Sequence, residues 1–271
     1  MSFKYGFIGC GNMGSCLISA VSKTVEPKAV AVCDFSLDKA ENMKKQYGVI
    51  LSDICEIAEK AKYIVLGVKP QGMADTLLSI ADILKKRLEC GNDFIIVTML
   101  AGVTTDKIEK TLNLKCKVIR IMPNTPCQVG EGMVLYCANL LVKDADKADF
   151  LNDMQKAGLF DEIEEGKIDM ACAVSGCGPA FAYMFIDAIA DGAVKCGLSR
   201  DKALIYASKM LEGSAKMVMQ TGIHPAKLKD NVCSPGGSTI EGVQTLEKYA
   251  FRSAVSESVI SAYKRTVELG K

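Results

Sequence analysis

The stretch Tyr5-Gly6-Phe7-Ile8-Gly9-Cys10-Gly11-Asn12-Met13-Gly14 decides the fold of this chain. Its opening residues predict a short buried strand, and residues 15–21 have helical character, so three glycines with G-x-G-x-x-G spacing lie where a strand passes into a helix. There the first glycine permits the tight turn, the second lets a dinucleotide pyrophosphate approach the backbone, and the third lets helix and strand pack closely. The free N–H groups at the start of the helix then hold the phosphates.

An acidic residue after the next strand supports this interpretation. The apolar run at residues 29–32 leads to Asp34, twenty residues beyond Gly14, and an acidic residue at this spacing normally binds the ribose hydroxyls. A G-x-G-x-x-G motif by itself also occurs in ordinary glycine-rich turns. The strand, the helix and Asp34 together favour a dinucleotide site over such a turn.

Composition and charge exclude several classes of protein. With 271 residues, 49% hydrophobic and 24% charged, the chain has room for one large or two moderate globular domains and is not disordered. A net charge of +1 provides no field for nucleic acid or anionic lipid, and a single histidine excludes a histidine-rich metal site. We expect no membrane span, because no apolar run approaches the roughly 20 residues required. Twelve scattered cysteines, without a C-x-x-C pair or a signal peptide, indicate reduced thiols in a cytoplasmic protein.

Apolar runs alternate with helical stretches through the first half of the chain. Strict alternation predicts a doubly wound parallel sheet, and such sheets bind ligands at the carboxyl ends of their strands. We expect strands at residues 5–8, 29–32, 63–68, 94–98 and 118–122, and two further strands at 132–137 and 160–163. The intervening helices are expected at residues 38–47, 54–61, 71–88 and 104–112.

Three loops that follow predicted strands are candidates for the site. Gly67-Val68-Lys69-Pro70 ends the third strand abruptly, because proline cannot continue a ladder, although a simple strand ending would look the same. Met99-Leu100-Ala101-Gly102-Val103 is small enough in its middle for a flat ring to lie against the backbone. Pro123-Asn124-Thr125-Pro126 is a stiff loop whose polar side chains serve either a ligand or the turn itself.

No alternating strands are expected beyond Glu164, where we place a domain boundary between residues 1–164 and an all-α domain at 165–271. The predicted helix at residues 179–196 is apolar on most of its circumference, and such a helix needs partners all round. The next helix is expected to begin after Ser199 and to stop at Gly222, with apolar residues such as Leu204 and Met210 facing inward. A second subunit is expected to supply part of the cover.

The loop Cys233-Ser234-Pro235-Gly236-Gly237-Ser238-Thr239 opens a predicted helix in this domain. Its glycines expose consecutive N–H groups at a helix N-terminus, which suits a carboxylate or a phosphate, and three hydroxyl side chains add further donors. A plain capped turn needs only one Ser or Thr and one Gly. The composition of the loop therefore favours a binding site.

At these loops the chain resembles the pyrroline-5-carboxylate reductases. The resemblance runs nearly end to end, through the N-terminal glycine motif and residues 68–70, 101–103, 122–126, 174–180 and 228–239. It implies a Rossmann-type sheet domain followed by an all-α dimerisation domain. It also implies reduction of the C=N bond of pyrroline-5-carboxylate to L-proline, the last step of proline biosynthesis, with NADH or NADPH.

The resemblance further implies roles for individual residues. The cofactor would be contacted by Ile8, Gly9, Cys10, Gly11, Asn12, Met13, Gly14, Gly67, Val68, Lys69, Pro70, Met99, Leu100 and Ala101. Asp34 and Ser36 would face its adenosine ribose, and Asn231 would reach the cofactor across a subunit boundary. The substrate would be bound by Ser238, Thr239 and Glu165. The family forms dimers through the helical domain, and the dimers assemble into pentamers of dimers.

The mechanism expected from these roles depends mainly on positioning. We expect the amides of Gly236 and Gly237 to hold the substrate carboxylate and the hydroxyl of Thr239 to bond the ring nitrogen. Protonation of that nitrogen makes the imine carbon a better acceptor of the hydride. Ser234 is the second candidate catalytic hydroxyl, and no metal ion is expected.

Two departures from the family pattern bear on activity. Cys177 stands where the family usually has serine, and a thiol is a poorer hydrogen-bond donor. Asp34-Phe35 stands where many NADP-using relatives have Asn-Arg. Because an aspartate repels a 2′-phosphate and a phenylalanine cannot bind one, we favour NADH, while Ser36 and Lys39 leave NADPH open.

Two other classes of function remain open. Another imine reductase or a β-hydroxyacid reductase would share the two-domain plan, and the latter would need a lysine as acid. Lys195 lies near the far end of the long helix, which argues against that role. A dinucleotide-sensing module without catalysis would need no loop at residues 234–239.

Overall fold

The computed structural model describes residues 2–269, which divide into two compact units. One unit comprises residues 2–177 and 262–269, and the other comprises Gly178–Ser261. The boundary predicted at residue 164 marks the end of the sheet. Residues 165–177, which follow it, pack with the sheet unit.

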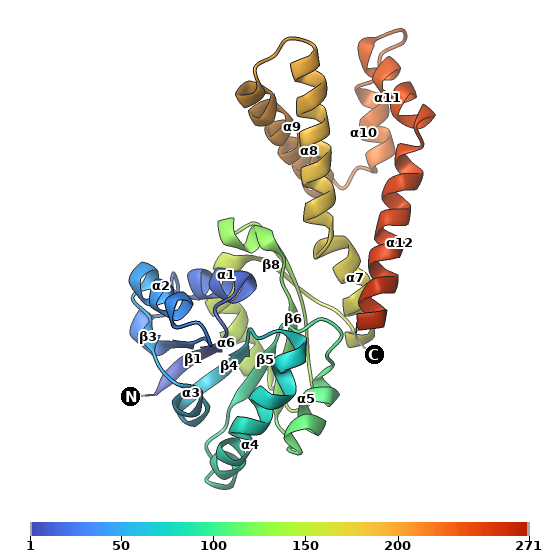
Figure 1. Cartoon of the computed structure of the whole chain (residues 1–271). Coiled ribbons are helices and arrows are strands. Elements are labelled where there is room, and N and C mark those ends of the chain that lie inside the picture. Colours follow the sequence, from blue (N-terminus) through green and yellow to red (C-terminus); the bar gives the residue numbers. More distant parts are fainter. Residues whose placement is uncertain (1, 270–271) are drawn as a thin grey trace. The chain divides into compact units, whose positions relative to one another are not determined.

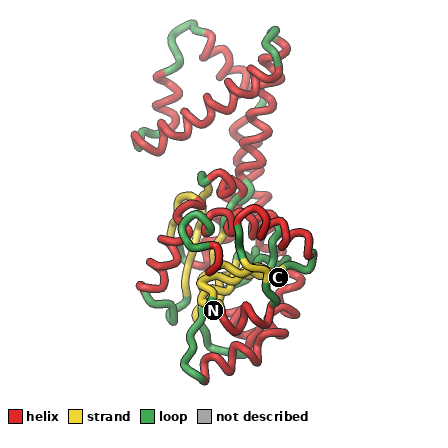
Figure 2. The backbone as a smooth tube through the Cα atoms, turned by 90° about the vertical axis from the view of Figure 1, so that its left-hand side faces the viewer, coloured by secondary structure: helices red, strands yellow, loops and turns green. Residues whose placement is uncertain are grey.

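Residues 2–269 contain one sheet of eight strands in the order β3-β2-β1-β4-β5-β6-β7-β8 (Figures 1 and 2). The strands are β1 Phe3–Ile8, β2 Val30–Cys33, β3 Ile50–Leu51, β4 Ala61–Leu66, β5 Ile95–Thr98, β6 Lys117–Met122, β7 Gly132–Ala138 and β8 Gly158–Glu162. The first six are parallel, β7 is antiparallel to β6, and β8 is parallel to β7. The chain order reverses at β1, so β1 and β4 form the switch point at which such sheets bind ligands.

Helices cover both faces of this sheet. They are α1 Asn12–Val21, α2 Leu37–Tyr47, α3 Ile54–Lys60, α4 Met73–Glu89, α5 Thr105–Leu112, α6 Asp144–Met154 and α7 Ile168–Ser175, with short 3-10 turns η1 Pro27–Ala29, η2 Pro70–Gly72, η3 Thr125–Val129, η4 Gln155–Ala157 and η5 Glu165–Lys167. Buried residues of α1, α2 and α6 form one core cluster, and those of α3, α4 and α5 form another.

The strands feed both clusters because successive side chains point to opposite faces. On β4, Tyr63 and Val65 join the α1 face, and Ile64 and Leu66 join the α4 face. This explains why the strands appear in the sequence as continuous apolar runs, as expected for a sheet that is covered on both sides.

The second unit is helical, as predicted. It contains α8 Gly178–Lys195, α9 Arg200–Thr221, α10 Pro225–Asn231, α11 Ser238–Lys248 and the first part of α12 Phe251–Leu269. Helices α8 and α9 pack as a hairpin closed by the Asp191–Arg200 ion pair at 2.5 Å (Figure 1). Ser199 and Gly222 flank α9 as predicted, and Gly222 adopts the left-handed conformation.

Several details differ from the sequence prediction. Strand β3 has only two residues, too few to show a period, and helix α6 has no predicted counterpart. The reversal of β7 was also not predicted, because a strand's direction depends on the connection before it. Here the short turn η3 joins β6 to β7, and antiparallel strands can be joined by a short connection.

The sequence analysis expected no membrane span, but one stretch of the described chain is long and apolar enough to be a candidate by length and composition alone. Within Glu165–Lys195, an 18-residue window has a mean hydropathy of 1.4, and 11% of that window is buried inside the chain. The stretch consists of η5, α7 and α8 in succession. Predicted inward positions on α9, Leu204 and Met210, are likewise more than a third exposed, so this unit exposes much apolar surface.

Candidate active site

The glycine turn between β1 and α1 has the geometry that its spacing predicts. Gly9 has a φ of +110°, and its N–H donates to the carbonyl of Cys33 at 2.8 Å. A Cβ on Gly14 would lie 2.3 Å from the Gly9 carbonyl oxygen, whereas a Cβ on Gly11 would meet nothing in the described chain within 4 Å. The first and third glycines are therefore required by the fold, and the second borders open space.

Helix α1 begins at this turn without competition for its amides. Its N-cap is Gly11, and within residues 2–269 no side chain caps it. The first N–H groups of a helix lack intrahelical partners and bind anions. The turn therefore provides donors for a pyrophosphate at the position the motif predicts.

The carboxylate of Asp34 is fixed at the end of β2 by two backbone amides. It accepts from the N–H of Cys10 at 2.6 Å and from the N–H of Ser36 at 2.8 Å. These contacts join the glycine turn to the start of α2. They place one negative charge beside the turn, in a side chain that remains partly exposed.

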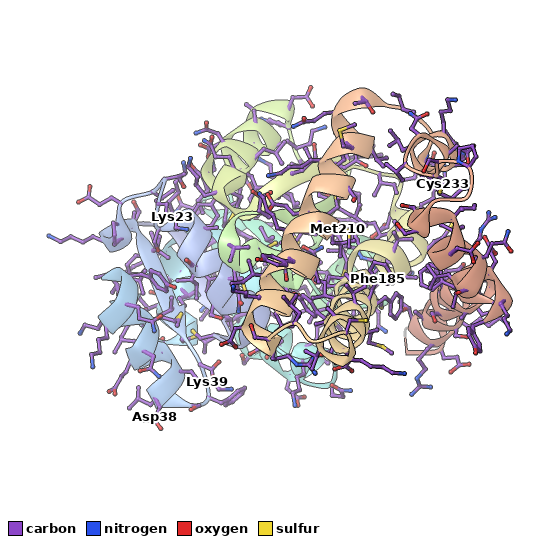
Figure 3. All side chains as sticks on the ribbon, turned by 90° about the horizontal axis from the view of Figure 1, so that it is seen from above. Lys23, Asp38, Lys39, Phe185, Met210 and Cys233 are labelled. Atoms are coloured by element: carbon purple, nitrogen blue, oxygen red, sulfur yellow. The ribbon has the colours of Figure 1, made fainter. Side chains whose placement is uncertain are left out.

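A cavity of about 870 Å³ lies along the carboxyl ends of β1, β2 and β4, within the sheet unit. Its walls include seven residues predicted to bind the cofactor: Ile8, Gly9, Gly11, Asp34, Gly67, Val68 and Lys69. The walls also include Phe35 and Lys39, which the sequence analysis weighed for cofactor preference, and residues without a predicted role, among them Ser52, Asp53, Ile54, Asp75, Thr76 and Ser79. Phe35 is 99% exposed, and Lys39 lies on the first turn of α2 next to Asp38 (Figure 3).

Other predicted cofactor residues lie beside the cavity or elsewhere. Met13 packs against the core, and Pro70 starts η2. In the turn after β5, Met99 and Leu100 pack on opposite faces of the sheet, and Ala101 packs against the small core cluster that contains Met122 and Ile168. Asn231 ends α10 in the helical unit and is exposed.

The two cysteines at the turn are neutral thiols. Burial, followed by the charge of Asp34, raises the pKa of Cys10 and of Cys33 to about 12. The Cys10 Sγ lies 3.7 Å from the carbonyl oxygen of Cys33. These thiols therefore carry no charge toward a ligand in the physiological pH range.

Glu165 lies in the sheet unit, and both of its oxygens are engaged there. One accepts the N–H of Thr105 at 2.7 Å, and the other accepts the Thr105 hydroxyl at 3.0 Å. The guanidinium of Arg120 approaches the first oxygen at 3.8 Å. The structure thus groups Glu165 with the start of α5.

The loop before α11 has the features of an anion cradle. Gly236 has a φ of +68°, the N–H of Gly237 donates to the Ser234 carbonyl at 3.0 Å, and Gly237 is the N-cap of α11. In the described chain no side chain caps this helix start. Ser238 and Thr239 are exposed, and Figure 3 marks the loop at Cys233. The predicted substrate residues other than Glu165 are therefore together at one helix N-terminus.

Sequence reasoning missed Arg120, although a signal was present. It interrupts the apolar run Lys117-Val118-Ile119-Arg120-Ile121-Met122, and a charged residue inside a doubly covered strand needs a buried partner. The sequence analysis also missed the backbone amides that bond Asp34, for a different reason. Backbone N–H groups leave no mark in a sequence.

The single histidine is used structurally. His224 is the N-cap of α10, where its Nδ1 accepts from the N–H of Ala226 at 3.2 Å. Among residues 2–269 no group of three His, Cys, Asp or Glu side chains is placed to hold a metal ion.

Comparison with known families covers both halves of the chain. Residues 165–269 match the family described as pyrroline-5-carboxylate reductase dimerisation. Residues 4–112 match the family described as NADP oxidoreductase, coenzyme F420-dependent.

Individual relatives match over the full length. The chain is 41% identical to the pyrroline-5-carboxylate reductase of Escherichia coli (strain K12), over 100% of both chains. It is 35% identical to that of Methanosarcina acetivorans, over 99% of this chain and 98% of the relative. Among solved structures it is similar to Plasmodium falciparum pyrroline carboxylate reductase with NADP bound (TM-score 0.88, 32% identity, 99% and 98% covered). It is also similar to the pyrroline-5-carboxylate reductase of Coxiella burnetii (TM-score 0.87, 30% identity, 100% of both covered).

Proposed function

The chain belongs to the pyrroline-5-carboxylate reductase family, and we propose that the cavity in its sheet unit holds the cofactor while the loop before α11 holds the substrate. As in its relatives, the reaction reduces the C=N bond of pyrroline-5-carboxylate to L-proline with a pyridine nucleotide. The observation that carries the site assignment is the open N-terminus of α1, where Gly11 borders free space beside the cavity.

The cofactor site follows from the turn and the cavity together. The α1 amides and the space over Gly11 fit a pyrophosphate, and Asp34 and Ser36 lie where the adenosine ribose would extend along β2. The turn at Met99, Leu100 and Ala101 is proposed to contact the nicotinamide half of the cofactor, because it follows β5, the strand next to β4 in the sheet.

NADH is the proposed preferred cofactor. The Asp34 charge is held in place by two amides, and it would lie close to a 2′-phosphate. Two negative groups at short range repel each other strongly where solvent is partly excluded. Phe35 offers no charge to compensate, and the positive charges in the cavity wall are those of Lys39 and Lys69.

The substrate is a small acid, and the α11 N-terminus fits its carboxylate. We assign the amide of Gly236 and the free N–H groups at the start of α11 to that carboxylate, whereas the Gly237 N–H, predicted to join them, already donates to the Ser234 carbonyl. The hydroxyl of Thr239 is assigned to the ring nitrogen, with Ser234 and Ser238 as further hydroxyls. Glu165 is left out of these direct contacts because Thr105 and Arg120 occupy its oxygens.

Chemistry at this site needs positioning more than proton transfer. The cofactor supplies a hydride to the imine carbon, and the electron pair of the C=N bond passes to a nitrogen that already carries its proton. The chain's one histidine is engaged at α10. The residues therefore act by holding the substrate carbon at the correct distance and angle.

A homodimer through the helical unit explains its exposed apolar surface. The family match at residues 165–269 is to a dimerisation domain. Only 11% of the apolar window in Glu165–Lys195 is buried within one chain, and we propose that a second copy, rather than lipid, covers it. A pentamer of dimers is the proposed larger assembly. Light scattering in solution distinguishes the mass of a dimer from that of a decamer. The twelve free thiols support a cytoplasmic enzyme.

The proposed function is tested by cofactor oxidation with purified protein. We expect pyrroline-5-carboxylate to drive oxidation of NADH with stoichiometric formation of L-proline. Oxidation driven instead by the keto precursor of a β-hydroxyacid would favour a β-hydroxyacid reductase. Cofactor binding without turnover of any imine would favour a dinucleotide-sensing module.

A further inference from the structure

Arg120 is a fully buried cation in the sheet unit. It is 1% exposed and lies on β6 between Val118 and Met122, which share its face of the sheet. A buried guanidinium is costly unless it is paired, and an apolar residue of similar size usually stabilises a core as well or better. Its Nε has no hydrogen-bond partner in the described residues. Stability alone therefore does not account for an arginine here.

The partners of Arg120 lie at the start of α7. One terminal nitrogen lies 2.6 Å from the carboxylate of Asp169, in the first turn of α7, and the other lies 3.8 Å from Glu165 in η5. Both carboxylates are roughly one-third exposed, at 27% and 30%. The buried cation thus holds two acidic side chains in fixed positions on one side of the sheet.

Glu165 also bonds a segment that lies sixty residues away in sequence. It accepts both the N–H and the hydroxyl of Thr105, the first residue of α5. A carboxylate at a helix start is stabilised by the free amides and the helix dipole. Thr105 comes directly after the turn that begins at Met99, so Glu165 anchors the end of that turn.

Besides two local hydrogen bonds, from the Leu100 N–H to the Thr98 hydroxyl at 3.4 Å and from the Val103 N–H to the Leu100 carbonyl at 3.3 Å, the turn makes apolar contacts. Leu100 and Val103 are buried in the core beside α4, and Ala101 packs against the small core cluster that contains Met122 and Ile168. Gly102 has a φ of +71°. Apolar contacts set the depth of the turn against the sheet, while the hydrogen bonds of Glu165 are directional and set where its end lies.

We propose that Arg120 is a positioning residue that holds Glu165, and through it Thr105, so that the turn at residues 99–104 carries the nicotinamide half of the cofactor at its reactive position. The proposal rests on the proposed function of that turn. It gives Glu165 a role through Thr105 instead of a contact with the substrate. A displacement of about 1 Å in a reacting group can cost ~100-fold in rate, so a small loosening of the turn is sufficient to matter.

The test compares Glu165→Ala and Glu165→Gln with a matched ion-pair variant, Asp146→Asn. Asp146 pairs with Lys117 at 2.7 Å at the other end of β6, and both side chains are mostly buried. We expect Glu165→Ala to lower kcat about tenfold or more, with Glu165→Gln intermediate, because the reacting atoms are misplaced. We expect Asp146→Asn to lower the melting temperature while kcat stays near the wild-type value.

Hydrogen exchange measured by mass spectrometry provides a readout that needs no substrate. Residues 99–106 should exchange faster in Glu165→Ala than in wild type or Asp146→Asn. Arg120→Lys, which keeps the charge but not the fork of donors, should show a smaller change in the same segment. Binding of ADP-ribose should be unchanged in all variants, because it lacks the nicotinamide.

Two results would overturn the proposal. One is a wild-type exchange rate at residues 99–106 in Glu165→Ala. The other is faster exchange there without a loss of kcat. If the wild-type protein reduces no pyrroline-5-carboxylate, the proposed function fails, and the exchange comparison still decides whether Glu165 anchors the turn.

Discussion

The backbone N–H of Cys10 donates a 2.6 Å hydrogen bond to the carboxylate of Asp34, which joins the glycine turn to the end of β2. The other carboxylate oxygen accepts the N–H of Ser36. The fold therefore determines where this charge lies, and a bound ribose would meet a carboxylate that is already oriented. Hydrogen bonds to a charged group stabilise by about 1.5–3 kcal/mol, enough to hold it there.

Cofactor preference should follow this charge. We predict that Asp34→Asn combined with Phe35→Arg raises the ratio of kcat/KM for NADPH to that for NADH at least about tenfold, because one repulsive charge is removed and one attractive charge is added. Phe35→Arg alone, with Asp34 retained, is the matched control and should shift the ratio less. A wild-type enzyme that strongly prefers NADPH would contradict the assigned role of Asp34.

Alanine substitutions at two glycines of the turn should fail in different ways. In Gly14→Ala the new Cβ would lie 2.3 Å from the Gly9 carbonyl, so we predict a large fall in melting temperature. In Gly11→Ala the Cβ meets nothing in the described chain within 4 Å. We predict a normal melting temperature and a raised cofactor KM, because the methyl group would occupy the path of the pyrophosphate. Normal cofactor binding by Gly11→Ala would show that the phosphates lie elsewhere.

Acid should weaken one ion-pair cluster in a defined pH window. Asp149 accepts hydrogen bonds from Lys4, Lys62 and Tyr63. Partial burial acts to raise the Asp149 pKa, but these hydrogen bonds outweigh it and lower the pKa from the usual 3.8 to about 2. A lowered pKa in the folded state means that the stabilisation is present above pH 3.8 and is lost as the pH falls toward 2.

We therefore predict that Asp149→Asn lowers the melting temperature at neutral pH, and that the difference from wild type shrinks below about pH 4. Asp144→Asn on the same helix is the control. Its side chain is 99% exposed, and it should change the melting temperature little at any pH. A deficit in Asp149→Asn that does not depend on pH would mean that the cluster stabilises by packing and not by charge.

The thiols at the glycine turn should resist alkylation. Burial and Asp34 raise the pKa of Cys10 and Cys33 to about 12, so little thiolate is present at neutral pH. We predict that iodoacetamide modifies the exposed Cys55, Cys90 and Cys196 first in the native protein, as read by peptide mass spectrometry. Rapid modification of Cys10, with loss of cofactor binding, would show that the turn opens in solution.

Local sequence predicted those parts of the fold that local residues determine. The strand, turn and helix around Gly9 and Gly14 could be predicted because each glycine answers a backbone requirement within a few residues. The α9 boundaries at Ser199 and Gly222 are local in the same way. Strand β3, with two residues, and the reversed β7 depend on neighbouring strands and carry no such signal.

The candidate site was predictable only in part for a related reason. The loop residues that would touch a ligand have an unusual composition, as at Gly236 and Gly237. The residues that hold those loops in place do not. Thr105 and Glu165 meet across sixty positions in sequence, and only the charge of Arg120 inside an apolar strand pointed to such a partnership.

The most direct test of the proposed catalytic role is the kcat of Thr239→Ala compared with that of Thr245→Ala. Both threonines lie on α11, but Thr239 is in its first turn, whereas the Thr245 hydroxyl donates within the helix to the Glu241 carbonyl at 3.0 Å. We predict that Thr239→Ala lowers kcat at least about tenfold with an unchanged melting temperature and cofactor KM, and that Thr245→Ala turns over like the wild type. Wild-type turnover by Thr239→Ala would contradict the assignment of the substrate to the α11 N-terminus.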